Sequence, residues 1–169
     1  DTTTGKIAHV PISISSDFQE VRPQFKSVNG LISKGAVSPN GQRAVFEARG
    51  EILTAPAAKG DIRNVTNSSG VADRFPAWSP DGQSIAYLSD AGGEYKLRIE
   101  RSDGVGQPKE ITLGDAPAYY YRPIWSPDGK KISYTDNKHQ IWYVDVATGK
   151  NTKVDENPYE NPTLTMQPV

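Results

Sequence analysis

Three basic residues stand at similar places in the chain, each shortly before the same kind of tetrapeptide. Lys34, Arg74 and Arg122 come four, five and four residues before the serine of a Ser-Pro-Asn-Gly or Ser-Pro-Asp-Gly sequence. Clustered ammonium and guanidinium groups attract carboxylates, and Arg binds them with paired hydrogen bonds. If the three side chains point to one place, they form a cationic ring for acidic groups or C-terminal carboxylates of peptides. The alternative is ordinary salt bridging with nearby Asp or Glu.

The residue types needed for nucleophilic catalysis are sparse. The two histidines, His9 and His139, do not stand beside an obvious serine, and no Gly-x-Ser-x-Gly sequence occurs. The absence of cysteine excludes disulfides, thiolate metal sites and a cysteine nucleophile. We therefore predict no catalytic residue in this sequence, and no cofactor.

Oxygen-bearing side chains recur at the third position of the tetrapeptides, as Asn40, Asp81 and Asp128. Carboxylate and amide oxygens are ligands that calcium accepts. The same side chains are needed to bond the backbone of their own turns, and this structural role is the better explanation. We predict no metal site.

An aromatic run at Tyr119, Tyr120 and Tyr121, followed by Trp125, has two readings. It forms an exposed platform for a ligand, or it fills the space between neighbouring sheets. Packing is the more common use of such residues.

The elements that position these residues follow from a repeat. The tetrapeptides are Ser38–Gly41, Ser79–Gly82 and Ser126–Gly129, so their spacings are 41 and 47 residues. Pro presets φ at the second position, and Gly ends the turn where positive φ is common. Spacings near 40 to 45 residues are typical of four-stranded propeller blades. We name these tetrapeptides the marker turns.

Four short strands are predicted in each repeat. The expected first strands are 35–37, 76–78 and 123–125; the second, 43–46, 84–87 and 131–134; the third, 51–54, 95–99 and 140–144; the fourth, 62–66, 109–113 and 151–154. No stretch carries a convincing helical apolar period. The fold class is therefore all-β, a β-propeller fragment of about three four-stranded blades with partial blades at both ends.

The charge and hydrophobicity of the chain limit the classes of partner that it is expected to bind. The chain has 169 residues, with 19 Lys and Arg against 20 Asp and Glu. A net charge of -1 gives no field that would hold nucleic acid, and no window is apolar enough to insert in a membrane. We expect a peptide or protein partner.

Both ends repeat interior sequence. Asp1–Lys6 echoes Asp145–Lys150, and Gln167–Val169 matches Arg122–Ile124. The expected division is 1–14 as the last strand of a preceding blade, 15–30 as a connecting loop, 31–68, 69–114 and 115–156 as blades, and 157–169 as the start of a following blade. Three blades do not close a ring. We expect either the remainder of a parent chain or a homodimer that completes a six-bladed ring.

With Trp78 and Trp125 before the marker turns and Tyr87 and Tyr134 after them, the sequence resembles TolB-like and tricorn-type propeller repeats. The segments 10–18, 44–52 and 141–145 look like the N-terminal propeller region of bacterial tricorn-like serine peptidases. The resemblance implies a non-catalytic segment that gates or binds peptide substrate and supports assembly, with the serine nucleophile in a later domain of the parent. The alternative is a TolB-like protein-binding module with no protease attached. Relatives of both kinds imply a periplasmic or cell-envelope location, with the cytoplasm as the alternative.

Overall fold

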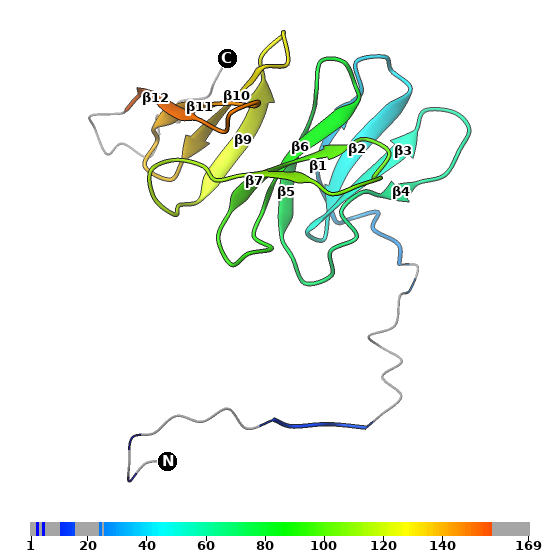
Figure 1. The fold of residues 1–169 in the computed structure, drawn as a ribbon. Coiled ribbons are helices and arrows are strands. Elements are labelled where there is room, and N and C mark those ends of the chain that lie inside the picture. The colour runs from blue at the N-terminus through cyan, green and yellow to red at the C-terminus, as the bar shows by residue number, and fades with distance from the viewer. Residues whose placement is uncertain (1–2, 4, 6–10, 16–23, 25, 157–169) are drawn as a thin grey trace.

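The computed structural model describes residues 3, 5, 11–15, 24 and 26–156. In this part of the chain there are twelve β-strands, arranged as three four-stranded antiparallel sheets (Figure 1). None of the described residues lies in a helix that is long and apolar enough to cross a membrane. The predicted all-β propeller architecture is confirmed.

Each sheet follows the sequence order of its strands, so each is one blade. Blade 1 contains β1 (Ile32–Val37), β2 (Arg43–Ala48), β3 (Glu51–Pro56) and β4 (Arg63–Asn64). Blade 2 contains β5 (Asp73–Trp78), β6 (Ser84–Ser89), β7 (Lys96–Arg101) and β8 (Lys109–Ile111). Blade 3 contains β9 (Tyr120–Trp125), β10 (Lys131–Asp136), β11 (Ile141–Asp145) and β12 (Asn151–Asp155).

The marker turns have one geometry in all three blades. The serine hydroxyl donates to the Asn or Asp side chain, at 2.8 Å from Ser38 to Asn40 and at 2.6 Å from Ser79 to Asp81. The same serine oxygen accepts a backbone N–H five residues further on, at 2.9 to 3.0 Å. The closing glycines have φ of 68° to 70°. Asn40, Asp81 and Asp128 thus bond their own turns, which is the structural role favoured from the sequence.

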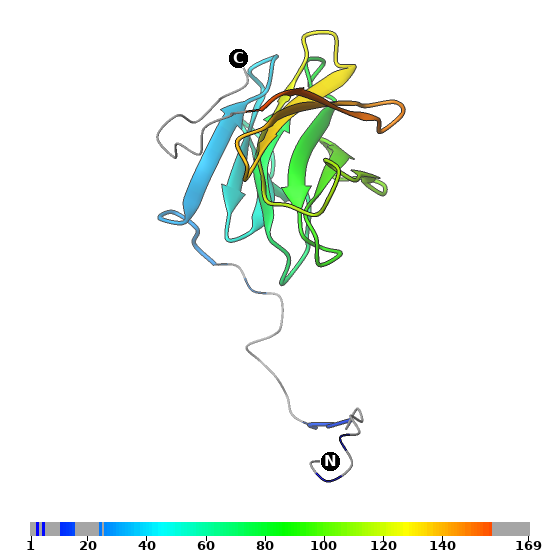
Figure 2. The same cartoon turned by 90° about the vertical axis from the view of Figure 1, so that its left-hand side faces the viewer.

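The blades pack through alternate residues of each strand, as the two-residue period of a strand requires. In β6, Ile85 and Tyr87 join a buried cluster with blade 1, whereas Ala86 and Leu88 join a second cluster with blade 3. Blade 2 is therefore enclosed on both faces, and the three sheets stand one behind another (Figures 1 and 2).

A repeated hydrogen bond ties each blade to the one before it. Trp78 Nε1 donates to the Ala36 carbonyl at 3.3 Å, and Trp125 Nε1 donates to the Ala77 carbonyl at 3.2 Å. The two bonds occupy equivalent positions just before the marker turns, and we call them the indole bonds. Blade 1 has Val37 at this position, and its side chain is 68% exposed.

The strand bounds differ from expectation by one to three residues, most of all in the first strands of the blades and in the fourth strand of blade 1. The inner strands β1, β5 and β9 begin three residues earlier than expected, because cross-strand pairs such as Ile32 with Ala48 extend them. The fourth strand of blade 1 is only Arg63–Asn64, although Val65 N–H still bonds the Ile52 carbonyl at 2.8 Å. The partial blades expected at 1–14 and 157–169 fall largely or wholly outside the described residues.

Candidate functional site

The predicted cationic residues lie on the three inner strands, which are neighbours. Strand β5 contacts both β1 and β9. Lys34 is in β1, Arg74 in β5 and Arg122 in β9; the first and last are exposed and Arg74 is half-buried. They lie inside the strands rather than just ahead of them.

The three side chains do not occupy one row across the strands. Lys34 and Arg122 each stand four residues before a marker serine, and the equivalent residue of blade 2 is Phe75. Phe75 and Arg122 have φ of 55° and 47°, and each precedes a proline where the register of its strand shifts. Arg74 pairs with Leu88 as Lys34 pairs with Glu47, and both partners stand nine residues after a marker serine. Arg74 therefore occupies the same register position as Lys34, and Arg122 is the residue that lies off this row.

Arg74 instead links all three blades. Its Nε lies 3.7 Å from Glu47 Oε1 in blade 1, and its guanidinium donates to the Tyr119 hydroxyl ahead of blade 3. Glu47 is 6% exposed and accepts two further hydrogen bonds, from Ser33 Oγ at 2.7 Å and from the Phe75 backbone N–H at 2.8 Å. These contacts are those of an inter-blade salt bridge, the alternative weighed above for this residue.

Four aromatic rings form a connected group beside Arg74, and two of them contact its guanidinium. Tyr119 packs against Tyr95 and Tyr121 at centroid distances of 5.0 and 4.9 Å, and Phe75 lies 6.2 Å from Tyr121. The Arg74 carbon Cζ is 5.4 Å from the Phe75 ring centroid and 5.7 Å from that of Tyr119, within cation–π range. We define the junction cluster by its six residues: Glu47, Arg74, Phe75, Tyr95, Tyr119 and Tyr121.

The tyrosine run divides between two roles. Tyr120 is 2% exposed, and its hydroxyl donates to the carbonyls of Leu113 and Ala116 at 2.7 and 2.8 Å. Burial raises the pKa of Tyr120 to about 12, so this phenol stays protonated. Tyr121 is 37% exposed and Tyr119 is half-buried, so the outer two tyrosines form the accessible edge of the junction cluster.

The part of the chain that the structure describes contains one of the two histidines, His139. His139 lies in the β10–β11 hairpin with φ of 61°, and its N–H donates to the Asp136 carbonyl at 3.1 Å. His9 lies outside the described residues. No group of three or more His, Asp or Glu in the described part of the chain is arranged to hold a metal ion.

Sequence reasoning missed three members of the junction cluster: Glu47, Phe75 and Tyr95. One signal was available for Glu47, because blades 2 and 3 have Leu88 and Thr135 at the equivalent position. A charged residue in a position that other repeats fill with uncharged ones needs a partner.

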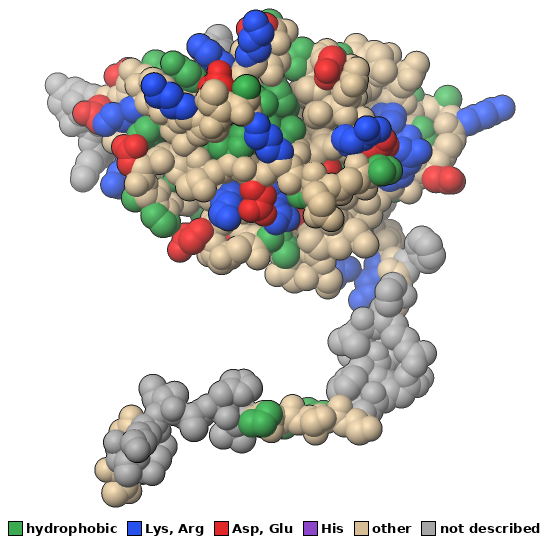
Figure 3. All heavy atoms as spheres, viewed as in Figure 1, with side chains coloured by type: hydrophobic (Ala, Val, Ile, Leu, Met, Phe, Trp, Pro, Cys, Tyr) green, Lys and Arg blue, Asp and Glu red, His purple; other side chains and the backbone are tan. Residues whose placement is uncertain are grey.

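On the face seen in Figure 3, basic and acidic side chains are interspersed rather than gathered by sign.

Comparison with known proteins agrees with this architecture. Residues 12–168 match the family model of the TolB beta propeller domain. The chain is 24% identical over 160 residues to dipeptidyl-peptidase 5 of Porphyromonas gingivalis, covering 88% of this chain and 22% of that relative.

Two solved structures share the fold. TolB from Acinetobacter baumannii aligns with a TM-score of 0.58 and 26% identity, covering 80% of this chain and 34% of that one. A protein assigned as TolB from Agrobacterium tumefaciens aligns with a TM-score of 0.63 and 23% identity, covering 75% of this chain and 46% of that one. The chain thus spans less than half the length of each of these three proteins. Since the family model extends over most of its length, the chain belongs to the TolB beta propeller domain family.

Proposed function

We propose that this chain is a non-catalytic propeller segment that binds peptide or protein chains at its inner strands, within a larger peptidase of the tricorn-like kind. The observation that carries the proposal is the junction cluster, where all three blades meet and where Tyr121 and Arg74 remain 37% and 39% exposed. Partly exposed tyrosine and arginine are the residue types that dominate binding surfaces. Gating of substrate and support of assembly are the roles that we assign to it.

The relative from Porphyromonas gingivalis supports a peptidase as the parent, because its name states that activity. The cationic residues Lys34 and Arg122 are proposed to attract acidic groups or C-terminal carboxylates toward the inner strands. Arg74 contributes to the same surface through the aromatic rings that it holds in place.

Peptide capture by the full parent protein tests this function. Charge reversal at Arg122, together with Tyr121→Ser, is expected to weaken capture of acidic peptides by about tenfold, the usual effect of losing one charged contact. Lys59→Glu is the matched control, because Lys59 is an exposed cation in the β3–β4 loop. Unchanged capture in the double variant, with the control also unchanged, would reject the proposed surface.

A TolB-like protein-binding module with no protease attached is the second candidate. The family match and the two TolB structures favour it. Reading the coding sequence on both sides of this segment discriminates between the two. Further blades followed by a peptidase domain support the first candidate, and a propeller with no peptidase domain supports the second.

The cellular location is inferred from the relatives of these two candidates. We propose the periplasm or cell envelope, with the cytoplasm as the alternative. Fractionation of cells that express the tagged parent protein decides between them, because recovery with cytoplasmic markers alone contradicts export.

The free faces of blades 1 and 3 are proposed to be covered by the remainder of the parent chain or, in the isolated segment, by a second copy that completes a ring of six. Each indole bond runs from a tryptophan to the carbonyl one residue before the equivalent position in the preceding blade. In a two-copy ring, the same place would bring Val37 of one copy opposite the Ile124 carbonyl of the other. Val37→Trp is therefore expected to tighten self-association, as measured by light scattering. A compact monomer at all concentrations, for both the wild type and the variant, contradicts the homodimer.

A further inference from the structure

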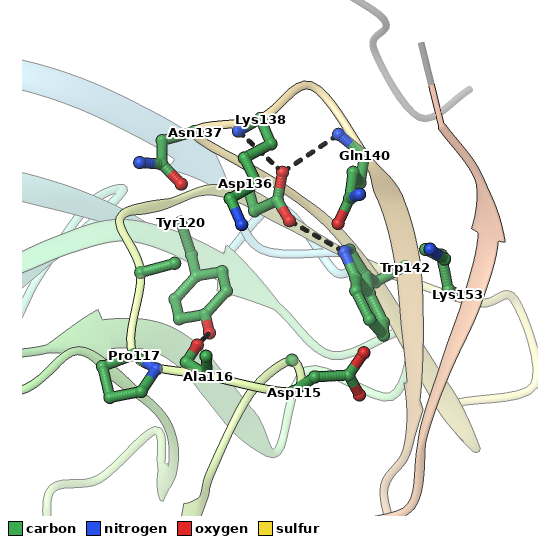
Figure 4. Close-up of a pocket in the computed structure, with 12 residues that line it drawn as sticks. Asp115, Ala116, Pro117, Tyr120, Asp136, Asn137, Lys138, Gln140, Trp142 and Lys153 are labelled. Atoms are coloured by element: carbon green, nitrogen blue, oxygen red, sulfur yellow. Dashed lines mark hydrogen bonds between the residues drawn. The ribbon is translucent and has the colours of Figure 1, made fainter. Parts of the chain in front are cut away.

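A pocket of about 250 Å³ opens in blade 3, between the loop that enters the blade and the β10–β11 hairpin (Figure 4). Asp115, Ala116 and Pro117 line it from the loop, and Lys138 and Gln140 line it from the hairpin. The volume is smaller than the roughly 300 to 1,000 Å³ of pockets for drug-sized ligands. It restricts an occupant to the size of an amino acid or a very short peptide.

Hydrogen bonds hold both walls of the pocket in place. On the loop side, the Tyr120 hydroxyl bonds the Leu113 and Ala116 carbonyls. On the hairpin side, the Asp136 carboxylate accepts the backbone N–H groups of Lys138 and Gln140 at 2.9 and 3.0 Å, and Trp142 Nε1–H at 3.0 Å. The cavity is thus formed in advance, which limits the entropy lost on binding.

In blade 2 a side-chain hydrogen bond joins the corresponding hairpin to the incoming loop. There Asp90, eleven residues after its marker serine, accepts the Ala72 N–H of the incoming loop at 2.7 Å. The equivalent residue in blade 3 is Asn137, which is exposed and lines the pocket. Asp136 bonds its own hairpin and the indole, and Tyr134 of β10 accepts the Gly114 N–H at the start of the loop at 2.9 Å. Blades 2 and 3 therefore differ in the residue at this position of the hairpin.

Charges of opposite sign face the pocket from different sides. Figure 4 shows the Asp115 carboxylate on the loop side, below Trp142, and Lys153 beside the indole on the strand side. Lys153 Nζ lies 6.0 Å from the Trp142 ring centroid and bonds Glu156 at 2.7 Å. That hydrogen bond holds the pKa of Lys153 above its ordinary value, and Asp115 adds to the effect. Lys138 brings a second ammonium group from the hairpin.

We propose that this pocket binds a small zwitterion, a free amino acid or a dipeptide with both termini unblocked. Asp115 receives the ammonium group, Lys138 and Lys153 receive the carboxylate, and the apolar wall of Ala116 and Pro117 receives a small side chain. The pocket shares no residue with the junction cluster, and its occupancy does not depend on peptide capture there.

Calorimetric titration of the full chain with Ala-Ala, N-acetyl-Ala-Ala and Ala-Ala amide tests the proposal. Ala-Ala is expected to bind, and blocking either terminus is expected to weaken binding by about tenfold, because each block removes one charged contact. Binding of all three compounds with equal affinity, or of none of them, overturns the proposal.

Variants assign each end of the ligand. Asp115→Asn is expected to remove the preference for a free ammonium, so that Ala-Ala and N-acetyl-Ala-Ala bind alike. Lys138→Met with Lys153→Met is expected to remove the preference for a free carboxylate. Lys59→Met, far from the pocket in sequence and exposed, is the control and is expected to bind as the wild type does. Equal melting temperatures establish that the variants fold, and an unchanged preference in a folded variant contradicts the assigned contact.

Discussion

The Glu47 carboxylate of blade 1 accepts the backbone N–H of Phe75 in blade 2 at 2.8 Å. The register of β5 shifts between Arg74 and Ala77, so Phe75 lies at a β-bulge and has φ of 55°. A bulge leaves a residue outside the regular ladder of its strand. Here the carboxylate of the preceding blade supplies the acceptor, and the bulge becomes part of the joint between two blades.

Removal of this acceptor should loosen the joint. Glu47→Ala is expected to lower the free energy of unfolding by about 1 to 3 kcal/mol, the cost of a buried N–H without a partner. Glu47→Gln keeps an acceptor oxygen, so its loss should be smaller. Urea unfolding measures both, with the exposed Glu94→Ala as a control expected within about 0.5 kcal/mol of wild type. Equal losses for the alanine and glutamine variants would show that the charge beside Arg74 matters more than the acceptor.

The indole bonds predict a matched pair of effects. Trp78→Phe and Trp125→Phe each remove one N–H donor to a carbonyl of the previous blade. Each is expected to cost about 1 to 2 kcal/mol from the lost hydrogen bond and the smaller ring. Denaturant unfolding compares the two variants. A large loss for one and none for the other would show that the two joints are not equivalent.

Gly50 is required by both its conformation and its surroundings. Its φ is 79°, and a Cβ built on it would lie 2.8 Å from the Val71 carbonyl oxygen. Gly50→Ala is therefore expected to cost about 2 to 4 kcal/mol, from the positive φ and from the shift of a backbone that cannot yield easily. Gly41→Ala is the control, because φ is 68° there and nothing lies within 4 Å. It should cost only about 1 kcal/mol in thermal unfolding. Similar losses at the two glycines would argue that the contact with Val71 is unimportant.

Glu100 should make stability depend on pH. Burial raises the pKa of Glu100, although the hydrogen bond that its carboxylate accepts from the Tyr87 hydroxyl at 2.8 Å opposes the rise. A raised folded-state pKa gives a contribution that is full below the unfolded pKa of about 4.3 and is lost as pH rises through the folded value. Glu100→Gln is expected to be more stable than the wild type at neutral pH.

The advantage of the glutamine variant should shrink as the pH falls from the raised folded-state pKa of Glu100 toward about 4.3. Below that pH the carboxyl is protonated in both states, so the difference should no longer change with pH. Urea unfolding at a series of pH values measures it. A constant difference between variant and wild type across the series would exclude titration of Glu100 as its cause.

The fold was predictable because its decisive signals are local. Each marker turn contains its own Ser, Pro and Gly, and the turn geometry needs no distant partner. The beginnings of the inner strands were missed because Asp73 and Arg74 read as loop residues, although Asp73 is fully buried. Pairing with Ser89 and Leu88 of the next strand, rather than local propensity, extends β5 to these residues.

The site was less predictable because its contacts join distant parts of the chain. Arg74 shares its register position with Lys34, and its contacts come from residues that the neighbouring blades supply. Its partners Glu47 and Tyr119 come from two other blades, and no periodicity links them to it. The pocket of blade 3 is lined by Asn137, which stands where blade 2 has Asp90.

The two indole bonds run the same way, from a tryptophan to the carbonyl of the sheet before it. The contact between two blades therefore has a donor on the later blade and an acceptor on the earlier one. A repeat that contains the tryptophan supplies the donor itself. A further blade with a tryptophan at this position would therefore find the equivalent acceptor, the Ile124 carbonyl, in blade 3. A repeat without the tryptophan, such as blade 1 with Val37, can accept the indole of the next blade but has no indole to donate to a preceding one.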